Sequence, residues 1–294
     1  MPESRAADSP RIDLAGMVLV SLAMFAVMFP LIQGRERGWD SWTIASLIAF
    51  VPAMALFAWQ QRHRERTIGS ALVPPSLFMH RSFTAGLAIM LVVFSGLGSL
   101  FLVLTYNLQL GQGWSVLRTS VAVVSWPIGI ALTSPIARRY ANSHGRRVIA
   151  IGLATMNVGA LALIATIAVI GPAATWWQIA LPVLVIGLGM GMAVPILTGV
   201  VLADIDQDLA GAASGIANAV MQLGTALGIA IVGTVYFSLT ESTMPTRAEA
   251  FSDAAATTLW YQVAVFTLAL CVTPLLPHAA RKEAAPAEAA PQPR

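Results

Sequence analysis

Three neutral polar residues form the clearest chemical pattern in this 294-residue sequence. Asn218, Gln222 and Thr225 are four and three positions apart within an apolar run, so they share one face of an α-helix. Such a face is costly against lipid and is expected to turn toward protein or a wet cavity. The pattern therefore has two interpretations: hydrogen bonds between neighbouring helices, or the lining of a cavity for a small molecule.

Two further residues are candidates for the lining of that cavity. Trp126 falls in the middle of an apolar run, where it either packs in a core or forms a cavity wall. Asn107 lies near the outer end of another run, between Tyr106 and Gln109. At that position it is either a cavity residue or a residue of the membrane interface.

Catalytic and metal chemistry is not indicated by the remaining polar residues. The sequence has no phosphate-binding glycine loop, nucleophile elbow or zinc-protease motif, so an enzyme is not expected. We also expect no cofactor and no metal, because the histidines fall outside the apolar runs without ligand spacing: His63, His80, His144 and His278.

Carboxylates are absent from the centres of the apolar runs, although the chain has 14 Asp and Glu residues. Asp13 suits the first turn of a helix, where a negative charge is favourable. Asp13 and Asp204 are expected at the aqueous ends of spans, where water would screen them. The sequence thus predicts no membrane-buried carboxylate that could relay protons.

The elements that must position these residues are predicted from composition. The chain is 57% hydrophobic and 11% charged, whereas soluble chains are about 45–50% apolar and about 25% charged. The lipid bilayer is therefore the expected surroundings. Nucleic acid is not expected as a partner, because the 17 Lys and Arg residues form no patch interleaved with aromatic residues.

Eight continuous apolar runs are each close to the roughly 20 residues that a helix needs to cross a bilayer. They span roughly 13–33, 41–60, 84–106, 116–137, 148–171, 177–202, 213–237 and 258–277. The fold class predicted is an all-α integral membrane protein with a pair of helices followed by six more. The predicted division is a polar segment 1–12, the helix pair 13–60, a basic cytoplasmic linker 61–83, a six-helix bundle 84–277 and a disordered cytoplasmic tail 278–294.

The distribution of basic residues predicts the orientation. With eight spans both termini lie on one side of the membrane, and that side carries 13 of the 17 Lys and Arg residues. Because basic loops stay in the cytoplasm, both termini are expected to be cytoplasmic and the protein is expected in the cell (plasma or inner) membrane. The arginines of the turn that contains Arg146 and Arg147 would then lie near anionic headgroups.

Small residues four positions apart predict close contacts between helices. Six glycines form three such pairs: Gly187 with Gly191, Gly211 with Gly215, and Gly224 with Gly228.

Two segments carry a resemblance to a known family. The stretch "SPIARRYANSHGRRVI" resembles the second-half copy of the cytoplasmic loop motif of the major facilitator superfamily. Gly145, Arg146 and Arg147 match that motif, and Asn142 stands where an aspartate is usual. The stretch "GAASGIANAVMQLGTALGIAIVGTV" is similar to the penultimate helix of the fourteen-span drug:proton antiporters of the EmrB–QacA-like type.

That resemblance implies a transporter that exports drugs or other small molecules by proton antiport. It implies two linker helices followed by a C-terminal six-helix bundle, with the six-helix N-terminal half missing from this chain. The expected partners are the lipid bilayer, an amphipathic small-molecule substrate, and either the missing half or a second copy of the chain. The alternatives are a non-transporting membrane scaffold or assembly subunit, and an inactive truncated transporter.

Overall fold

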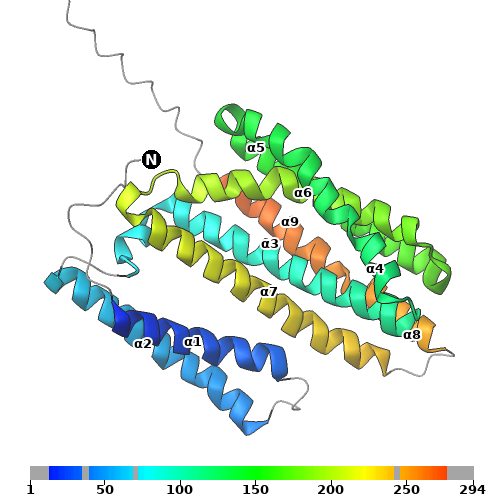
Figure 1. The fold of residues 1–294 in the computed structure, drawn as a ribbon, viewed down its shortest axis with the longest axis horizontal. Helices are drawn as coiled ribbons and strands as arrows, with labels where there is room; N and C mark the ends of the chain where they lie inside the picture. Colours follow the sequence, from blue (N-terminus) through cyan, green and yellow to red (C-terminus); the bar gives the residue numbers. More distant parts are fainter. Residues whose placement is uncertain (1–12, 35–39, 69–71, 242–245, 277–294) are drawn as a thin grey trace, which may run out of the picture.

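The computed structural model describes residues 13–34, 40–68, 72–241 and 246–276. Within these residues the protein is 91% helical and has no strand. The α-helices in Figure 1 are α1 (Leu14–Gln33), α2 (Ser41–Ile68), α3 (Arg81–Tyr106), α4 (Val116–Val123), α5 (Ser125–Ile170), α6 (Trp176–Leu202), α7 (Ala210–Thr240), α8 (Arg247–Thr258) and α9 (Trp260–Val272). Short helical turns between them include η1 (Pro75–Met79), the π-helical η2 (Asn107–Gly111) and η3 (Gly171–Ala173).

The described residues contain eight segments long and apolar enough to cross a membrane. Two of these segments combine helices: α4 and the first part of α5 form Val116–Ala141, and α8 with α9 forms Arg247–Leu275. This confirms the predicted all-α membrane fold. In Figure 1, α1 and α2 form a hairpin beside α7, and the other helices form one bundle.

Several helices extend beyond the spans predicted from hydropathy. Helix α2 continues to Ile68 and α3 begins at Arg81, so most of the predicted linker 61–83 is helical or forms the turn η1. Helix α7 also extends beyond its predicted span at both ends, and the last membrane segment begins earlier than predicted, at the start of α8. Hydropathy underestimates these lengths because polar side chains at the ends of a helix can reach water while the helical hydrogen bonds continue.

Helix α5 is two helices that meet at His144, whose backbone dihedrals of −140° and 27° are not helical. Both parts pack on α6. A Cβ atom at Gly129 would approach Leu184 O to 2.6 Å, and one at Gly152 would approach Gly189 O to 2.6 Å. The predicted basic loop is therefore the tight turn between the two parts of α5, which projects from the bundle in Figure 1.

Trp126 lies in the middle part of the span Val116–Ala141, as the sequence predicts, but the helix is interrupted next to it. Helix α4 ends at Val123 and Trp126 is the second residue of α5, directly after the break at Val124. Pro127 provides the physical reason, because proline has no N–H to donate to the preceding turn.

The glycine pairs divide into two groups. Gly187 and Gly191 of α6 lie against α5, where a Cβ would clash with the carbonyl of Trp126 and the hydroxyl of Thr133. On α7, a Cβ at Gly224 would lie 2.5 Å from Leu91 O, and one at Gly228 would clash with Ser95 O. These four glycines allow α6 to approach α5, and α7 to approach α3, almost backbone to backbone.

Gly211 and Gly215 differ from that expectation. A Cβ at either position would meet nothing within 4 Å, so neither glycine permits a helix contact within the described residues. The reason is their angular position on α7: they share the exposed face of Asn218 and Gln222, whereas Gly224 and Gly228 point toward α3.

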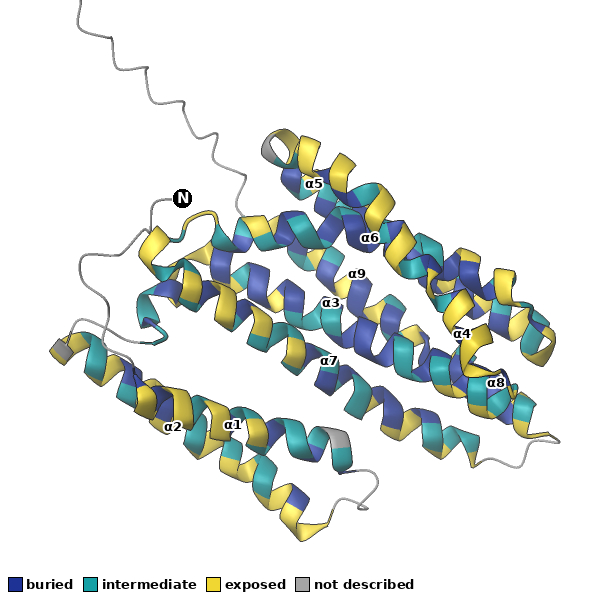
Figure 2. Ribbon diagram, in the orientation of Figure 1, coloured by how far each residue is buried: buried dark blue, intermediate teal, exposed yellow. Residues whose placement is uncertain are grey.

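Many residues of the α1–α2 hairpin are exposed, as Figure 2 shows for both helices, and large apolar side chains are among them. Phe25 is 63% exposed and Val51 is 66% exposed. Ser46 Oγ donates a hydrogen bond to Ala26 O at 2.8 Å and joins the two helices. The hairpin reaches the bundle through contacts of α1 with α7, so most of its surface is suited to lipid.

Candidate functional site

The predicted polar stripe lies on α7, and its members differ in exposure. Asn218 and Gln222 are exposed, whereas Thr225 is partly buried at the contact with α3. Thr225 Oγ1 donates to Met221 O at 2.9 Å, and Thr225 O would lie 2.6 Å from a Cβ at Gly98. The amide groups of Asn218 and Gln222 thus lie on an exposed face of α7 and have no hydrogen-bond partner among the described residues. The hydroxyl of Thr225 is bonded within its own helix.

Asn107 is fully buried in the protein. It begins the π-helical turn η2, and its Oδ1 accepts a hydrogen bond from Ser252 Oγ of α8 at 3.4 Å. Its Nδ2 has no partner among the described residues. The wider π-helical turn rotates this side chain toward α8, which a regular helical periodicity does not predict.

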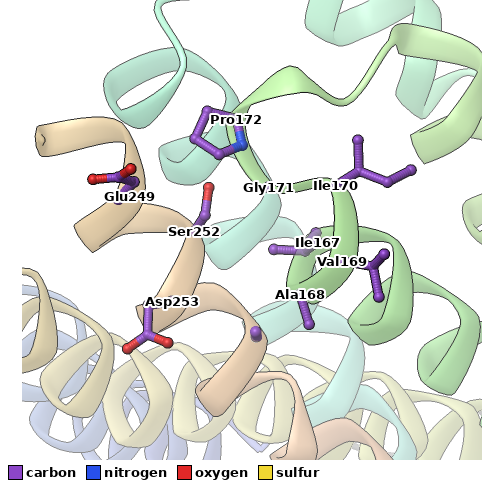
Figure 3. A pocket seen from close by; sticks show the side chains of 10 residues that line it. Ile167, Ala168, Val169, Ile170, Gly171, Pro172, Glu249, Ser252 and Asp253 are labelled. Atoms are coloured by element: carbon purple, nitrogen blue, oxygen red, sulfur yellow. The ribbon is translucent and has the colours of Figure 1, made fainter.

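A cavity of about 450 Å³ lies between the end of α5, η3 and α8 (Figure 3). Ser252 lines it, and Glu249 and Asp253 stand one helical turn apart at its edge. Both carboxylates are exposed. Within the described residues, no group of three or more His, Cys, Asp or Glu side chains is arranged to hold a metal ion.

Trp126 lines a second cavity, of about 370 Å³, between α3 and the α4–α5 break. Its ring packs edge-to-face against Phe101, with ring centroids 4.9 Å apart. Its indole Nε1 is buried and has no hydrogen-bond partner among the described residues. Trp126 is therefore part of a cavity wall, while the α7 stripe lines neither of these two cavities.

The structure thus separates the predicted site residues into three places. The stripe lies on the open face of α7, Asn107 is buried in contact with Ser252 of the first cavity, and Trp126 lines the second. The last two places are both near the C-terminal end of α3.

The basic turn carries the residues of the cytoplasmic loop motif. Gly145 is buried, and a Cβ there would lie 3.3 Å from Ile196 of α6, which keeps the turn close to that helix. Arg146 is partly buried and Arg147 exposed, and neither forms an ion pair with a described carboxylate. The side chain of Asn142 lies outside the described part of the chain.

One buried polar cluster was missed by the sequence analysis. Tyr261 Oη donates to Ser95 Oγ at 3.0 Å, and the side chains of Gln262 and Ser99 contact each other at 2.9 Å. Ser99 and Gln262 are fully buried, and the cluster joins α3 to α9. The four-residue spacing of Ser95 and Ser99 was the available signal, because it places both hydroxyls on one helical face.

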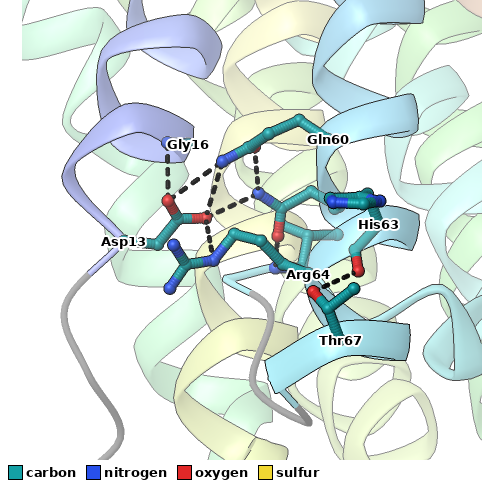
Figure 4. A network of polar contacts seen from close by, with 8 residues as sticks. Asp13, Gly16, Gln60, His63, Arg64 and Thr67 are labelled. Atoms are coloured by element: carbon teal, nitrogen blue, oxygen red, sulfur yellow. Dashed lines mark hydrogen bonds and ion pairs between the residues drawn. The ribbon is translucent and has the colours of Figure 1, made fainter.

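Asp13 is also more buried than the sequence predicts, at 4% exposure. Its carboxylate caps α1 by accepting from Gly16 N at 2.9 Å, and it accepts from Gln60 at 3.1 Å and from Gln61 at 2.8 Å (Figure 4). Arg64 Nε lies 3.5 Å from the same carboxylate. Burial by itself raises the pKa of Asp13, but these hydrogen bonds and the arginine outweigh it and hold the pKa below its ordinary value.

Comparison with known proteins identifies the family to which this chain belongs. Residues 38–229 match the sequence profile of the Major Facilitator Superfamily. The chain is 35% identical over 243 residues to the probable actinorhodin transporter of Streptomyces coelicolor, covering 81% of this chain and 42% of that protein. It is 28% identical to the tetracenomycin C resistance and export protein of Streptomyces glaucescens, covering 84% and 45%.

The multidrug resistance protein Stp of Mycobacterium tuberculosis is also 28% identical, with 81% of this chain and 43% of that protein covered. The chain spans less than half the length of these relatives. Their names describe transport, export and resistance rather than enzymatic activity. With most of its length matched to the family profile and its eight apolar helical spans, the chain is a multi-pass membrane protein that belongs to the Major Facilitator Superfamily.

Proposed function

We propose that this chain is the C-terminal part of an exporter of small amphipathic molecules that works by proton antiport. In this proposal α1 and α2 are linker helices, and the remaining helices are one of the two bundles of a fourteen-span antiporter of the EmrB–QacA-like type. The names of the relatives, which include export and resistance proteins, support the substrate class.

The observation that carries the proposal is the open polar face of α7. Asn218 and Gln222 expose amide groups in the middle part of a membrane-spanning helix, where contact with lipid would be costly. Alternating access requires two bundles that enclose a central site between them. The face therefore fits a substrate cavity that a second six-helix bundle completes.

Proton coupling is expected to come from that second bundle. A coupling carboxylate must hold a proton within the membrane, which requires a raised pKa. Asp13 does not meet this requirement: its pKa is lowered rather than raised, because its hydrogen-bond partners and Arg64 stabilise the charged carboxylate. Glu249, in the first turn of α8, and Asp253, in its middle, are both exposed.

The proposed location is the cell membrane, with both termini in the cytoplasm. The basic turn at His144 would then lie at the cytoplasmic surface, where Arg147 is free to approach anionic headgroups. The Trp126 cavity and Glu249 would lie toward the outside.

Transport by the purified chain in liposomes tests this proposal. The chain would be reconstituted alone and together with the N-terminal half of the actinorhodin transporter relative. We expect drug-driven proton release only when the two are combined. Proton-coupled export by the chain alone would contradict the proposal, and cross-linking of two copies under those conditions would point to a homodimer.

A further inference from the structure

The turn η1 carries two large apolar side chains that the bundle leaves uncovered. Met79 is 84% exposed and Phe78 is 48% exposed. Among the described residues, every other large apolar side chain that is exposed lies within one of the eight spans, and these two lie outside all of them. Their exposure is therefore not explained by a helix that crosses the hydrocarbon core.

The turn is fixed to the bundle, so the exposed pair has a defined position. Leu77, directly before the pair, is 1% exposed and belongs to the hydrophobic core. Thr84 Oγ1 donates a hydrogen bond to Phe78 O at 3.0 Å and joins η1 to α3. The ring of Phe78 also packs edge-to-face against the buried ring of Phe83, with centroids 5.6 Å apart.

The length of the span that begins with α3 places η1 at the level of the lipid headgroups. This span, Arg81–Gly111, has 31 residues, so at about 1.5 Å per residue it is about 46 Å long. The hydrocarbon core of a bilayer is about 30 Å thick, and the bilayer with its headgroups is about 40–45 Å thick. Both ends of the span therefore extend into the headgroup region, and Met79, two residues before Arg81, lies there as well.

Basic side chains flank the exposed pair. His80 and Arg81 follow it directly, and both are exposed. Val73, two residues before η1, donates its N–H to Gln61 Oε1 at 2.9 Å. The turn thus begins close to the last two turns of α2, which carry the exposed Arg66. Apolar side chains next to cations suit the boundary between acyl chains and phosphate groups.

Two carboxylates belong to the same region but leave these cations available. Asp204 Oδ2 accepts a hydrogen bond from Ser82 Oγ at 2.7 Å, which places the turn between α6 and α7 at the end of the bundle where α3 begins. Glu65 is partly buried on α2. Among the described residues neither carboxylate forms an ion pair, so lipid phosphates would not compete with one.

We propose that η1 is an interfacial anchor whose partner is the phospholipid surface. Phe78 and Met79 insert between the acyl chains next to the headgroups, and Arg81 lies against the phosphate groups of the same leaflet. The contact fixes the height at which α3 enters the membrane. It depends neither on transport nor on a second bundle, so it can be measured on the chain alone.

Quenching by spin-labelled lipids in nanodiscs tests the proposal on the full chain. With Cys271→Ser as the background, the variant Met79→Cys is labelled with the fluorophore bimane. The lipids carry a nitroxide either near the headgroup or near the end of the acyl chain. We expect the nitroxide near the headgroup to cause the larger loss of fluorescence, because the label would lie among the acyl chains just below the headgroups.

Two positions provide references for this measurement. Val51 is 66% exposed near the middle of the α2 span, so in Val51→Cys the deep nitroxide should cause the larger loss. Asp206 is exposed in the turn between α6 and α7 at the same end of the bundle as η1. The label of Asp206→Cys should be quenched by aqueous iodide and by neither lipid. Phe78→Cys provides a second site in η1 and should behave like Met79→Cys.

A label at position 79 that responds to iodide and to neither nitroxide would overturn the proposal, since η1 would then lie in water. A larger loss from the deep nitroxide would also overturn it, because η1 would then lie within the hydrocarbon core. Failure of proton-coupled export would contradict the proposed function alone and would leave the order of quenching unchanged.

Discussion

The backbone carbonyl of Ser95 lies directly against Gly228, so that no Cβ atom fits between α3 and α7 at this point. The same Ser95 accepts a hydrogen bond from Tyr261 through its hydroxyl. One residue of α3 thus fixes the spacing to α7 by its backbone and the contact with α9 by its side chain.

Gly228→Ala should therefore push α7 away from α3. We expect a loss of about 1–3 kcal/mol in the free energy of unfolding, as for other overpacked cores, seen as a lower midpoint of thermal unfolding in detergent by circular dichroism. Gly215→Ala on the same helix is the control, because a Cβ there meets nothing within 4 Å. It should leave the midpoint unchanged or raise it, and equal effects of the two substitutions would contradict the packing argument.

The carboxylate of Asp13 should make the docking of α1 on α2 dependent on pH only under acidic conditions. Its pKa is below the ordinary value in the folded state, so its stabilising effect is complete above about pH 4, near the pKa of an unfolded aspartate. The effect is lost as the pH falls through the lower folded value. Amide hydrogen exchange at Gly16 should accelerate in that range and stay constant, apart from intrinsic rates, at higher pH.

Asp13→Asn should remove this dependence and accelerate exchange at Gly16 already at neutral pH. Asp206→Asn is a suitable control, because Asp206 is exposed in the turn between α6 and α7. The network would have no stabilising role if Asp13→Asn exchanged as slowly as the native chain at pH 7.

Single cysteines on α7 should distinguish a water-accessible face from a lipid-facing one. With Cys271 replaced, cysteines at 218 and 222 should react with a membrane-impermeant thiol reagent. A cysteine at 231 should react at least tenfold more slowly, because Ile231 is 49% exposed on a different, apolar face. Similar rates at all three positions would remove the support for a wet cavity.

The orientation is testable with fusions placed in the turns that the structure defines. A reporter that is active only outside the cytoplasm should be active when fused after Gly113, between η2 and α4, and inactive after Asp206. The expected cause is the retention of the basic turn at His144 in the cytoplasm. The reverse pattern of activity would show that the predicted orientation is wrong.

Most of the fold follows from the sequence, because a span must supply about 20 apolar residues and satisfy its own backbone hydrogen bonds. The contacts between helices follow less directly. Gly215 and Gly228 belong to identical spacing patterns, yet only Gly228 has a neighbouring helix in contact. The difference depends on which face of α7 meets α3, and a pattern in one helix does not contain that information.

The candidate site was predictable only in part. The shared face of Asn218 and Gln222 follows from helical periodicity, and both residues are exposed on it. The burial of Asn107 depends on the π-helical turn at the end of α3, which changes the direction of one side chain. The unpartnered N–H of Trp126 depends on three-dimensional distances to every neighbouring acceptor.

The contact of α1 with α7 has a consequence for biosynthesis. Helix α1, which ends at Gln33, leaves the ribosome long before α7, which ends at Thr240; at about 5–20 residues per second the interval is roughly 10–40 s. During this time the α1–α2 hairpin must persist in the bilayer without its docking surface. Two hydrogen bonds join α1 to α2: Gln61 donates to Asp13, and Ser46 donates to Ala26 O. These bonds would keep the hairpin assembled as an early insertion intermediate.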